Sequence, residues 1–249
     1  MNKFQGCDEE QETVDAALNR VAQYDWASIK EQLNRDGCAV LPSLLRQDDC
    51  RQIASRYDDG EIFRSHIHMK QHGFGQGEYK YYAYPLPDLV GQLRGALYAR
   101  LVAIANAWAD RMGTGIHYPD QHSDYLDRCH ASGQKRPTPL LLRYVEGDFN
   151  CLHQDLYGDL FFPLQVACLL SEPERDFEGG EFVLTEQRPR MQSRPQVVSL
   201  GQGDAAVFAV NTRPVRGKQR DYRVTMRHGV SRLRRGRRHT LGIIFHDAK

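Results

Sequence analysis

The sequence predicts an α+β protein in which helices in the first half support a sandwich or barrel of short strands in the second half. Two patterns carry this prediction. Before residue 113, apolar residues recur at helical spacing, whereas after Pro137 short β-rich runs follow one another at roughly the 8–12-residue spacing of all-β folds. The chain of 249 residues suffices for one large domain and shows no linker or internal repeat. We therefore expect a single domain over 1–249, with mainly helical support and a substrate loop in 1–135 and the β core in 136–249.

Composition excludes several classes of protein. Apolar residues make up 41% of the chain and charged residues 26%, which is typical of soluble globular proteins. No apolar run approaches the ~20 residues of a membrane span, and the acidic first thirty residues lack the basic-then-apolar order of a secretory signal. The 6 cysteines include no C-x-x-C pair, so neither a disulfide framework nor a zinc knuckle is expected. We expect a soluble, cytoplasmic protein with reduced thiols and no membrane association.

In the first part of the chain, four elements are expected in order. Residues 1–13 are acidic and polar, and we expect a loose tail. Residues 13–34 show apolar positions at helical spacing and predict a helix. The stretch 37–42 reads as a short strand ended by proline, and a second helix is expected over 47–57.

A long loop and a long helix follow. Residues 58–87 are rich in Gly, His, Tyr and Gln without a clean period, which predicts an irregular loop of the kind that is usually functional. Residues 88–112 predict the longest helix, with Asp88 and Gly113 as its caps. Its apolar stripe, a face for core packing, consists of Leu89, Leu93, Leu97, Leu101, Ile104 and Trp108.

Seven short strands are expected after Pro137, because these runs are rich in β-branched and aromatic residues and are bounded by turn-forming residues. The expected strands are 140–144, 161–170, 181–185, 196–200, 205–210, 222–230 and 240–245.

Three residues suggest a metal site. His153 and Asp155 are two apart, so in an extended chain both face the same side, together with Cys151, for which we expect a small packed thiol. In the strand 222–230, alternation places His228 on the apolar inward face. A single inward histidine is more typical of a core residue. Two histidines and one carboxylate together, however, form the open-sided ligand set of non-haem Fe(II) oxygenases.

A second pair of polar residues precedes the last strand. Arg238 and Thr240 share a face with Gly242 and Ile244, whose character indicates the core side of the strand. A guanidinium and a hydroxyl beside a metal suit the carboxylate of a second ligand.

Taken in order, these motifs resemble those of the Fe(II)/2-oxoglutarate-dependent oxygenases. The order His153-x-Asp155, His228 and Arg238-x-Thr240 carries this resemblance. Residues around the motifs are similar to the prolyl-hydroxylase-like branch, and other stretches are similar to a bacterial oxygenase family catalogued as acting on damaged nucleic acid. The first set is Arg143-Tyr144, Gly147, Gly179-Gly180-Glu181-Phe182 and 201–208, and the second set is 151–173 and 177–194.

The resemblance implies a single oxygenase domain with a double-stranded β-helix, or jelly-roll, core and N-terminal supporting helices. It implies Fe(II) held by His153, Asp155 and His228. It also implies 2-oxoglutarate held by Arg238 and Thr240, with Tyr144 as a further contact. Such an enzyme couples decarboxylation of 2-oxoglutarate by O2, giving succinate, to oxidation of a C–H bond, with ascorbate as the reductant in vitro.

Two further side chains bear on this site. Gln165 lies in an apolar strand, where an inward contact and a bond to the backbone are both open. AlkB-type dealkylases carry an Asn-x-Tyr pair ahead of the His-x-Asp motif, whereas this sequence has Tyr144 and then Asn150. A base dealkylase with this sequence would hold its co-substrate differently from those enzymes.

The substrate class stays open between two alternatives. The segment Arg213–Arg238 contains eleven Lys or Arg residues and one acid, a charge of +10. Such a run is typical of a solvated face, and it also suits single-stranded or damaged nucleic acid, with the loop His66–Tyr84 stacking on a base. Oxidative dealkylation of damaged bases, a DNA-repair activity, is therefore the first hypothesis. A hydroxylase of a protein (prolyl) or a small molecule is the alternative, and no obligate protein partner is expected.

The loop histidines allow one more interpretation. His66, His68 and His72 would suit a second metal site, although substrate contact explains a loop rich in His and Tyr equally well.

Overall fold

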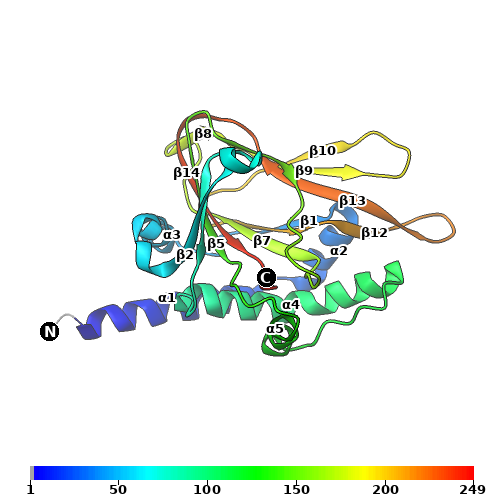
Figure 1. Cartoon of the computed structure of the whole chain (residues 1–249), viewed down its shortest axis with the longest axis horizontal. Helices are drawn as coiled ribbons and strands as arrows, with labels where there is room; N and C mark the ends of the chain where they lie inside the picture. Colours follow the sequence, from blue (N-terminus) through cyan, green and yellow to red (C-terminus); the bar gives the residue numbers. More distant parts are fainter. Residues whose placement is uncertain (1–2) are drawn as a thin grey trace.

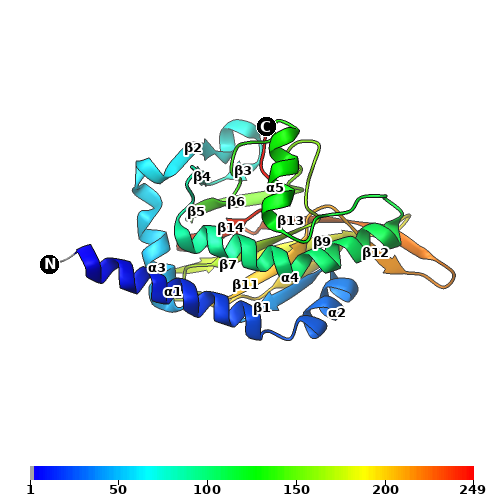
Figure 2. The same ribbon diagram turned by 90° about the horizontal axis from the view of Figure 1, so that it is seen from below.

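The computed structural model describes the backbone of residues 3–249 and the side chains of residues 11–249. It has three layers, in which two long helices cover the outer face of a large sheet and a smaller sheet faces the inner side (Figures 1 and 2). The helices are α1 (Lys3–Gln23), α2 (Trp26–Asp36), α3 (Gln47–Ser55), α4 (Asp88–Met112) and α5 (His122–Ala131). No helix among the described residues has the length and hydropathy needed to cross a membrane.

The large sheet has eight strands and the small sheet six. The large sheet runs β1 (Cys38–Leu41), β11 (Ala205–Ala209), β7 (Leu164–Leu169), β14 (Leu233–Ile243), β5 (Leu140–Val145), β4 (Glu78–Tyr82) and β2 (Phe63–His68), with β8 (Phe177–Gly179) beside β14. The small sheet runs β10 (Arg194–Val198), β9 (Phe182–Gln187), β13 (Asp221–Val230), β6 (Phe149–His153) and β3 (Gly75–Gln76), with β12 (Thr212–Arg216) beside β13. Two antiparallel sheets packed face to face confirm the predicted jelly-roll core.

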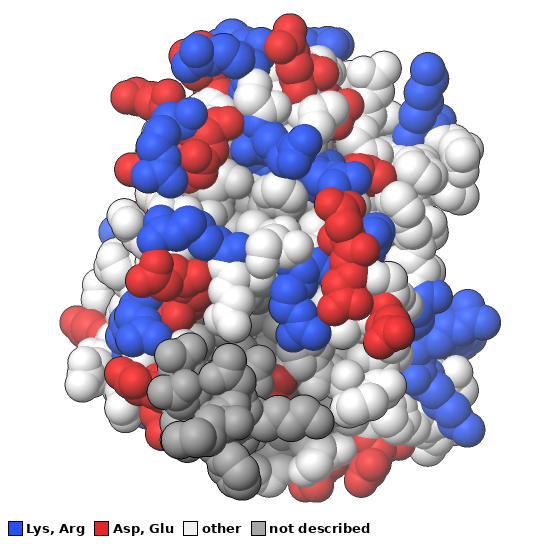
Figure 3. All heavy atoms as spheres, turned by 90° about the vertical axis from the view of Figure 1, so that its left-hand side faces the viewer, with Lys and Arg blue, Asp and Glu red and all other residues white. Residues whose placement is uncertain are grey.

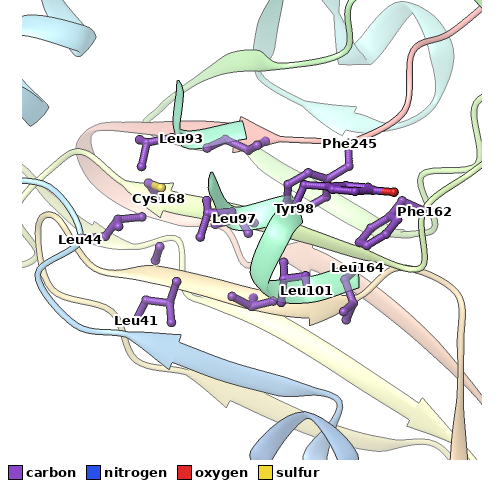
Figure 4. Close-up of a cluster of buried hydrophobic side chains, with 14 of the residues drawn as sticks. Leu41, Leu44, Leu93, Leu97, Tyr98, Leu101, Phe162, Leu164, Cys168 and Phe245 are labelled. Atoms are coloured by element: carbon purple, nitrogen blue, oxygen red, sulfur yellow. The ribbon is translucent and has the colours of Figure 1, made fainter. Parts of the chain in front are cut away.

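The helix α4 packs its apolar stripe onto the large sheet (Figure 4). Leu93, Leu97 and Leu101 are fully buried, and the ring of Tyr98 packs at a tilt of 40° against the ring of Phe162, with a centroid distance of 5.0 Å. The helix matches its predicted bounds and ends at Gly113, whose φ of 60° is left-handed. Its N-cap is Pro87 rather than Asp88, because Asp88 already lies in the first turn, where the helix dipole favours an acid.

Two predictions for the N-terminus are wrong. The expected loose tail is helical from Lys3, because its Glu and Gln residues are good helix formers that extend the amphipathic stretch after Thr13. The single helix expected over 13–34 is two helices. Asp25 starts the second one, since its carboxylate accepts hydrogen bonds from the backbone N–H groups of Ala27 and Ser28.

The irregular loop predicted over 58–87 is also wrong. Within it, β2 and β4 pair with each other, and β4 pairs with β5, so both extend the large sheet. The alternation of residues over Glu78–Tyr82 indicates a strand, since Tyr79 and Tyr81 are buried and Lys80 between them is not. The high Gly and His content of the flanking residues concealed this alternation.

The other expected elements are confirmed with shifted ends, including β1 and α3, and all seven strands after Pro137 are present. The last strand starts seven residues before the expected position, because the arginine-rich stretch from Leu233 already pairs with β8. The elements α5, β6, β8 and β12 were not predicted.

A buried ion pair fastens α4 to the end of the chain. Arg94 and Asp247 are buried, with 2.8 Å between Nη2 and Oδ1. The second carboxylate oxygen accepts from the Tyr84 hydroxyl at 2.9 Å and lies 2.8 Å from Nε2 of His130. Burial raises the pKa of Asp247, but Arg94, His130 and Tyr84 lower it below its ordinary value.

Asp247→Asn should lower the free energy of unfolding by about 3 kcal/mol, because it leaves a buried guanidinium without its counter-charge. Asp159→Asn, which breaks the exposed pair with Lys249, should cost less than about 0.5 kcal/mol. Urea unfolding at pH 7 measures both. Since the folded-state pKa of Asp247 is depressed, its contribution is complete above about pH 4 and is lost as the pH falls further. Equal effects of the two substitutions would contradict the role given to the buried pair.

Candidate active site

The three predicted metal ligands meet between the two sheets. His153 ends β6 and lies directly opposite His228 of β13, with 4.2 Å between the ring centroids. Asp155 follows two residues after the strand, with Oδ1 3.4 Å from Nε2 of His153 and Oδ2 3.3 Å from Nε2 of His228. The three ligand atoms lie within 4.8 Å of one another. The structure therefore brings together the two-histidine, one-carboxylate set that the sequence predicted.

Neighbouring groups hold these ligands in place. In the tautomer protonated at Nδ1, His153 donates to the carbonyl oxygen of Cys151 at 2.8 Å, which leaves its Nε2 lone pair free. Gln165 donates to Asp155 Oδ2, and the Tyr157 hydroxyl donates to Oδ1, each at 2.7 Å. Of the two interpretations left open for Gln165, an inward contact or a bond to the backbone, the structure shows the inward contact. Such outer partners orient metal ligands.

The protonation states of Asp155 and His228 suit a metal. Burial raises the pKa of Asp155, but hydrogen bonds and charge attraction from His153 and His228 lower it well below its ordinary value. Burial and the charge of His153 lower the pKa of His228. A carboxylate anion and a neutral imidazole are the forms that bind a divalent cation. Burial lowers the pKa of His153, but the hydrogen bond and the charge of Asp155 raise it above its ordinary value, so a metal ion at this site would compete with a proton on that ring.

A cavity of about 200 Å³ extends from these ligands between the sheets. Arg238, Thr240 and Tyr144, the residues expected to contact 2-oxoglutarate, all line it. Arg238 is 3% exposed and donates to the Thr240 hydroxyl at 2.6 Å, and its Nε has no hydrogen-bond partner. Burial lowers the pKa of Arg238 to about 10, so the guanidinium still carries its charge at neutral pH. No Asp or Glu of the described chain forms an ion pair with it.

A β-bulge explains what the sequence analysis missed here. Between the pairs His153–His228 and Asn150–Val230, β6 spans one residue more than β13. The extra residue brings Asn150 and His153 to the same cavity, and Asn150 donates to the Tyr144 hydroxyl at 3.3 Å. It also turns Cys151 outward, so the expected packed thiol is wrong and this cysteine is exposed. The other described cysteines are free and buried, as expected, and Cys7 lies outside the described side chains.

The basic segment Arg213–Arg238 does not form one surface. Arg213 is buried and pairs with Glu186, so this arginine of the segment is not available to contact phosphates. Arg235, on β14, pairs with Glu178 at 2.6 Å. On the face that carries α3 and the β8 end of the sheet, acidic and basic side chains interleave (Figure 3). Lys218 and Arg220 lie in the β12–β13 turn, whereas Arg223, Arg227, Arg232 and Arg237 are spread along β13, the following turn and β14.

Several solved structures with a similar fold are oxygenases. A prolyl hydroxylase from Trichoplax adhaerens, in complex with a hypoxia inducible factor peptide, superposes with a TM-score of 0.56 at 12% identity, over 98% of this chain and 93% of its own. A 2OG-Fe(II) oxygenase family oxidoreductase from Burkholderia pseudomallei gives a TM-score of 0.54 at 18% identity, covering 91% and 94%. A Pseudomonas putida prolyl-4-hydroxylase gives 0.50 at 15% identity, covering 90% and 99%.

Fold and ligand set together define a 2-oxoglutarate-dependent Fe(II) oxygenase. Within that class, the chain belongs to the Oxygenase-NA family, whose model matches residues 77–248 and is described as "Oxygenase, catalysing oxidative methylation of damaged DNA". Two uncharacterized proteins from Mycobacterium tuberculosis strains CDC 1551 and H37Rv are each 49% identical over 164 residues, or 66% of this chain and 70% of theirs. The predicted fold class and the predicted enzyme class are both confirmed.

Gln165→Leu should weaken metal binding by about 10- to 100-fold, because Asp155 loses the donor that orients its second oxygen. Gln202→Leu is a matched control, since that amide donates to the carbonyl of Leu170 away from the cavity. Titration of each metal-free variant with Co(II), followed by the visible absorption of the bound metal, gives the two dissociation constants to compare. Unchanged affinity in Gln165→Leu would remove this residue from the support of the metal ligands.

Proposed function

We propose that His153, Asp155 and His228 hold Fe(II) and that Arg238, Thr240 and Tyr144 hold 2-oxoglutarate beside it. One observation carries the second assignment. Arg238 is a charged guanidinium buried in the same cavity as the metal ligands, and it has no acidic partner in the described chain. A buried unpaired charge is costly, so the cavity favours an anionic ligand whose carboxylate completes the pair. A dicarboxylate reaching from the metal to Arg238 meets this requirement.

The side chains around the cavity have distinct tasks in this proposal. Thr240 already holds one nitrogen of Arg238, which leaves the other guanidinium donors for the co-substrate carboxylate. Asn150 positions the Tyr144 hydroxyl, and the ring of Tyr144 lies 5.7 Å from the Arg238 guanidinium carbon. Bound together, Fe(II), 2-oxoglutarate and O2 supply the oxidation of a substrate C–H bond. The apolar walls formed by residues such as Phe182 and Phe208 exclude water from that reaction.

For the substrate we propose an alkylated base in single-stranded or damaged nucleic acid, and we place the reaction in the cytoplasm. The family description supports a nucleic-acid substrate. Phe74 lines the cavity and is 47% exposed, so its ring is available to stack on an extruded base, with His72 stacked behind it at 5.3 Å. Lys218 and Arg220 near the tip of the β12–β13 hairpin supply cations for phosphates. Oxidation of an N-methyl group then releases formaldehyde and leaves the unmodified base.

Arg238→Met should raise the KM for 2-oxoglutarate about 30-fold, while binding of the metal persists. The loss corresponds to about 2 kcal/mol for a charge-assisted hydrogen-bonded pair. Arg235→Met, on the exposed part of the same strand, is the control and should leave this KM unchanged. Succinate formation against 2-oxoglutarate concentration measures the effect. Loss of metal binding in Arg238→Met would show that this arginine is misassigned.

Turnover on a methylated single-stranded oligonucleotide tests the substrate. With Fe(II), 2-oxoglutarate and ascorbate, succinate and formaldehyde should rise in step, and the variant His153→Ala/Asp155→Ala should form neither. Binding of the same oligonucleotide should weaken with salt, and Lys218→Ala/Arg220→Ala should reduce the slope of log K against log salt by about 2. Slow succinate formation without formaldehyde, and a flat salt dependence, would instead favour a hydroxylase of a protein or a small molecule.

A further inference from the structure

A second cluster of ligand atoms lies on the outer face of the large sheet, away from the cavity. Among the described residues, two groups of His, Cys, Asp and Glu bring three ligand atoms within 4.8 Å, and the second consists of His66, His68 and Glu78. His72, considered with the two histidines from the sequence, is not part of it, because its ring stacks on Phe74. The following paragraphs call this group the outer cluster.

Strand geometry explains why these side chains converge. His66 and His68 are two apart on β2 and therefore share a face, and His68 lies directly opposite Glu78 on β4. The ring centroids of the two histidines are 4.3 Å apart. Oε2 of Glu78 lies 2.6 Å from Nε2 of His66 and 3.7 Å from Nδ1 of His68. One carboxylate oxygen thus faces two imidazole nitrogens at once.

Arg143 holds the opposite side of this carboxylate. It is the cross-strand partner of Glu78 on β5, and its Nε and Nη2 lie 2.7 and 2.6 Å from Oε1. The guanidinium stacks on the ring of Tyr57 at 4.2 Å and also pairs with Asp58, so its own position is fixed. Arg143 therefore orients the Glu78 carboxylate, as second-layer groups orient metal ligands, and leaves Oε2 directed at the histidines.

From this arrangement we infer that the outer cluster binds a divalent transition-metal ion of the Zn2+ type. Two imidazoles and a carboxylate supply three of the four positions of a tetrahedral zinc site. The histidines are 37% and 53% exposed at their side chains, so water has access to the fourth position. Without a cation or a proton between them, the lone pairs directed at this point repel one another.

The outer cluster is separate from the proposed iron site. Tyr79, next to Glu78 on β4, points to the opposite face of the sheet and lines the cavity, so the two sites share no ligand. Metal at the outer cluster would join β2, the edge strand of the large sheet, to β4. His68 also directly precedes the segment 69–77, which carries Phe74. We therefore assign the bound ion a structural role at the edge strand.

Zinc stoichiometry tests the inference. Metal-stripped protein is equilibrated with Zn2+ alone and the bound metal is measured by atomic emission. The wild-type protein should bind two equivalents, His66→Ala/His68→Ala one, and His153→Ala/Asp155→Ala one. His72→Ala is the matched control, because it removes a neighbouring exposed histidine outside the cluster, and it should bind two.

The same comparison can overturn the inference. Equal zinc stoichiometry in the wild-type protein and in His66→Ala/His68→Ala would overturn it. A second contrary result would be that His153→Ala/Asp155→Ala is folded by circular dichroism but binds no zinc. Because His66 and His68 are exposed, their replacement leaves the core intact, and the first comparison stands even if the other variant does not fold. Saturating Zn2+ should raise the thermal midpoint of His153→Ala/Asp155→Ala by about 5 °C, and the added change Glu78→Gln should remove most of this rise.

Discussion

The antiparallel pairing of β6 with β13, with one extra residue in β6, is the constraint on which the site depends. It places His153 directly opposite His228 and leaves their nitrogens facing Asp155. A one-residue slip of this register would move one histidine to the outer face of the sheet. The close approach of β3 holds the bulge from the other side, because a Cβ at Gly75 would lie 2.4 Å from the carbonyl oxygen of Phe149. Backbone pairing, rather than side-chain packing, thus determines where the ligands meet.

Electrostatics then determine what the cavity accepts. The carboxylate of Asp155 and the two imidazoles line one cavity together with the guanidinium of Arg238 on β14, and burial strengthens each charge interaction there. A cation bound by Asp155 and the imidazoles, together with an anion bound by Arg238, would balance the charges of both groups. An apolar ligand would leave the charge of Arg238 without a partner, so the charge of a ligand matters more than its shape for binding in this cavity.

Local periodicity is sufficient for much of this structure. The spacing of apolar residues in α4 and the alternation along β13 specify which face each element buries, so the inward position of His228 follows from its own strand. Non-local features do not follow from such patterns. The bulge that brings Asn150 inward depends on how two strands pair, and the burial of Arg213 depends on Glu186, 27 residues away. Because pairing with distant acids cannot be read from the sequence, the basic segment Arg213–Arg238 does not form a single charged face in the structure.

The segment 69–77 borders the cavity and presents an exposed aromatic side chain to it. Met69 at its start is fully buried, and the carbonyl of Phe74 accepts from the backbone N–H of Cys151 within the bulge of β6. Gly75 and Gln76 near its end pair with β6, so both ends of the segment are held by the sheets, while the ring of Phe74 between them is exposed at the cavity. In the proposed function, the three metal ligands and the arginine that binds the co-substrate are constrained by their chemistry. Selection among substrates then rests on side chains such as Phe74 that reach the cavity without taking part in that chemistry.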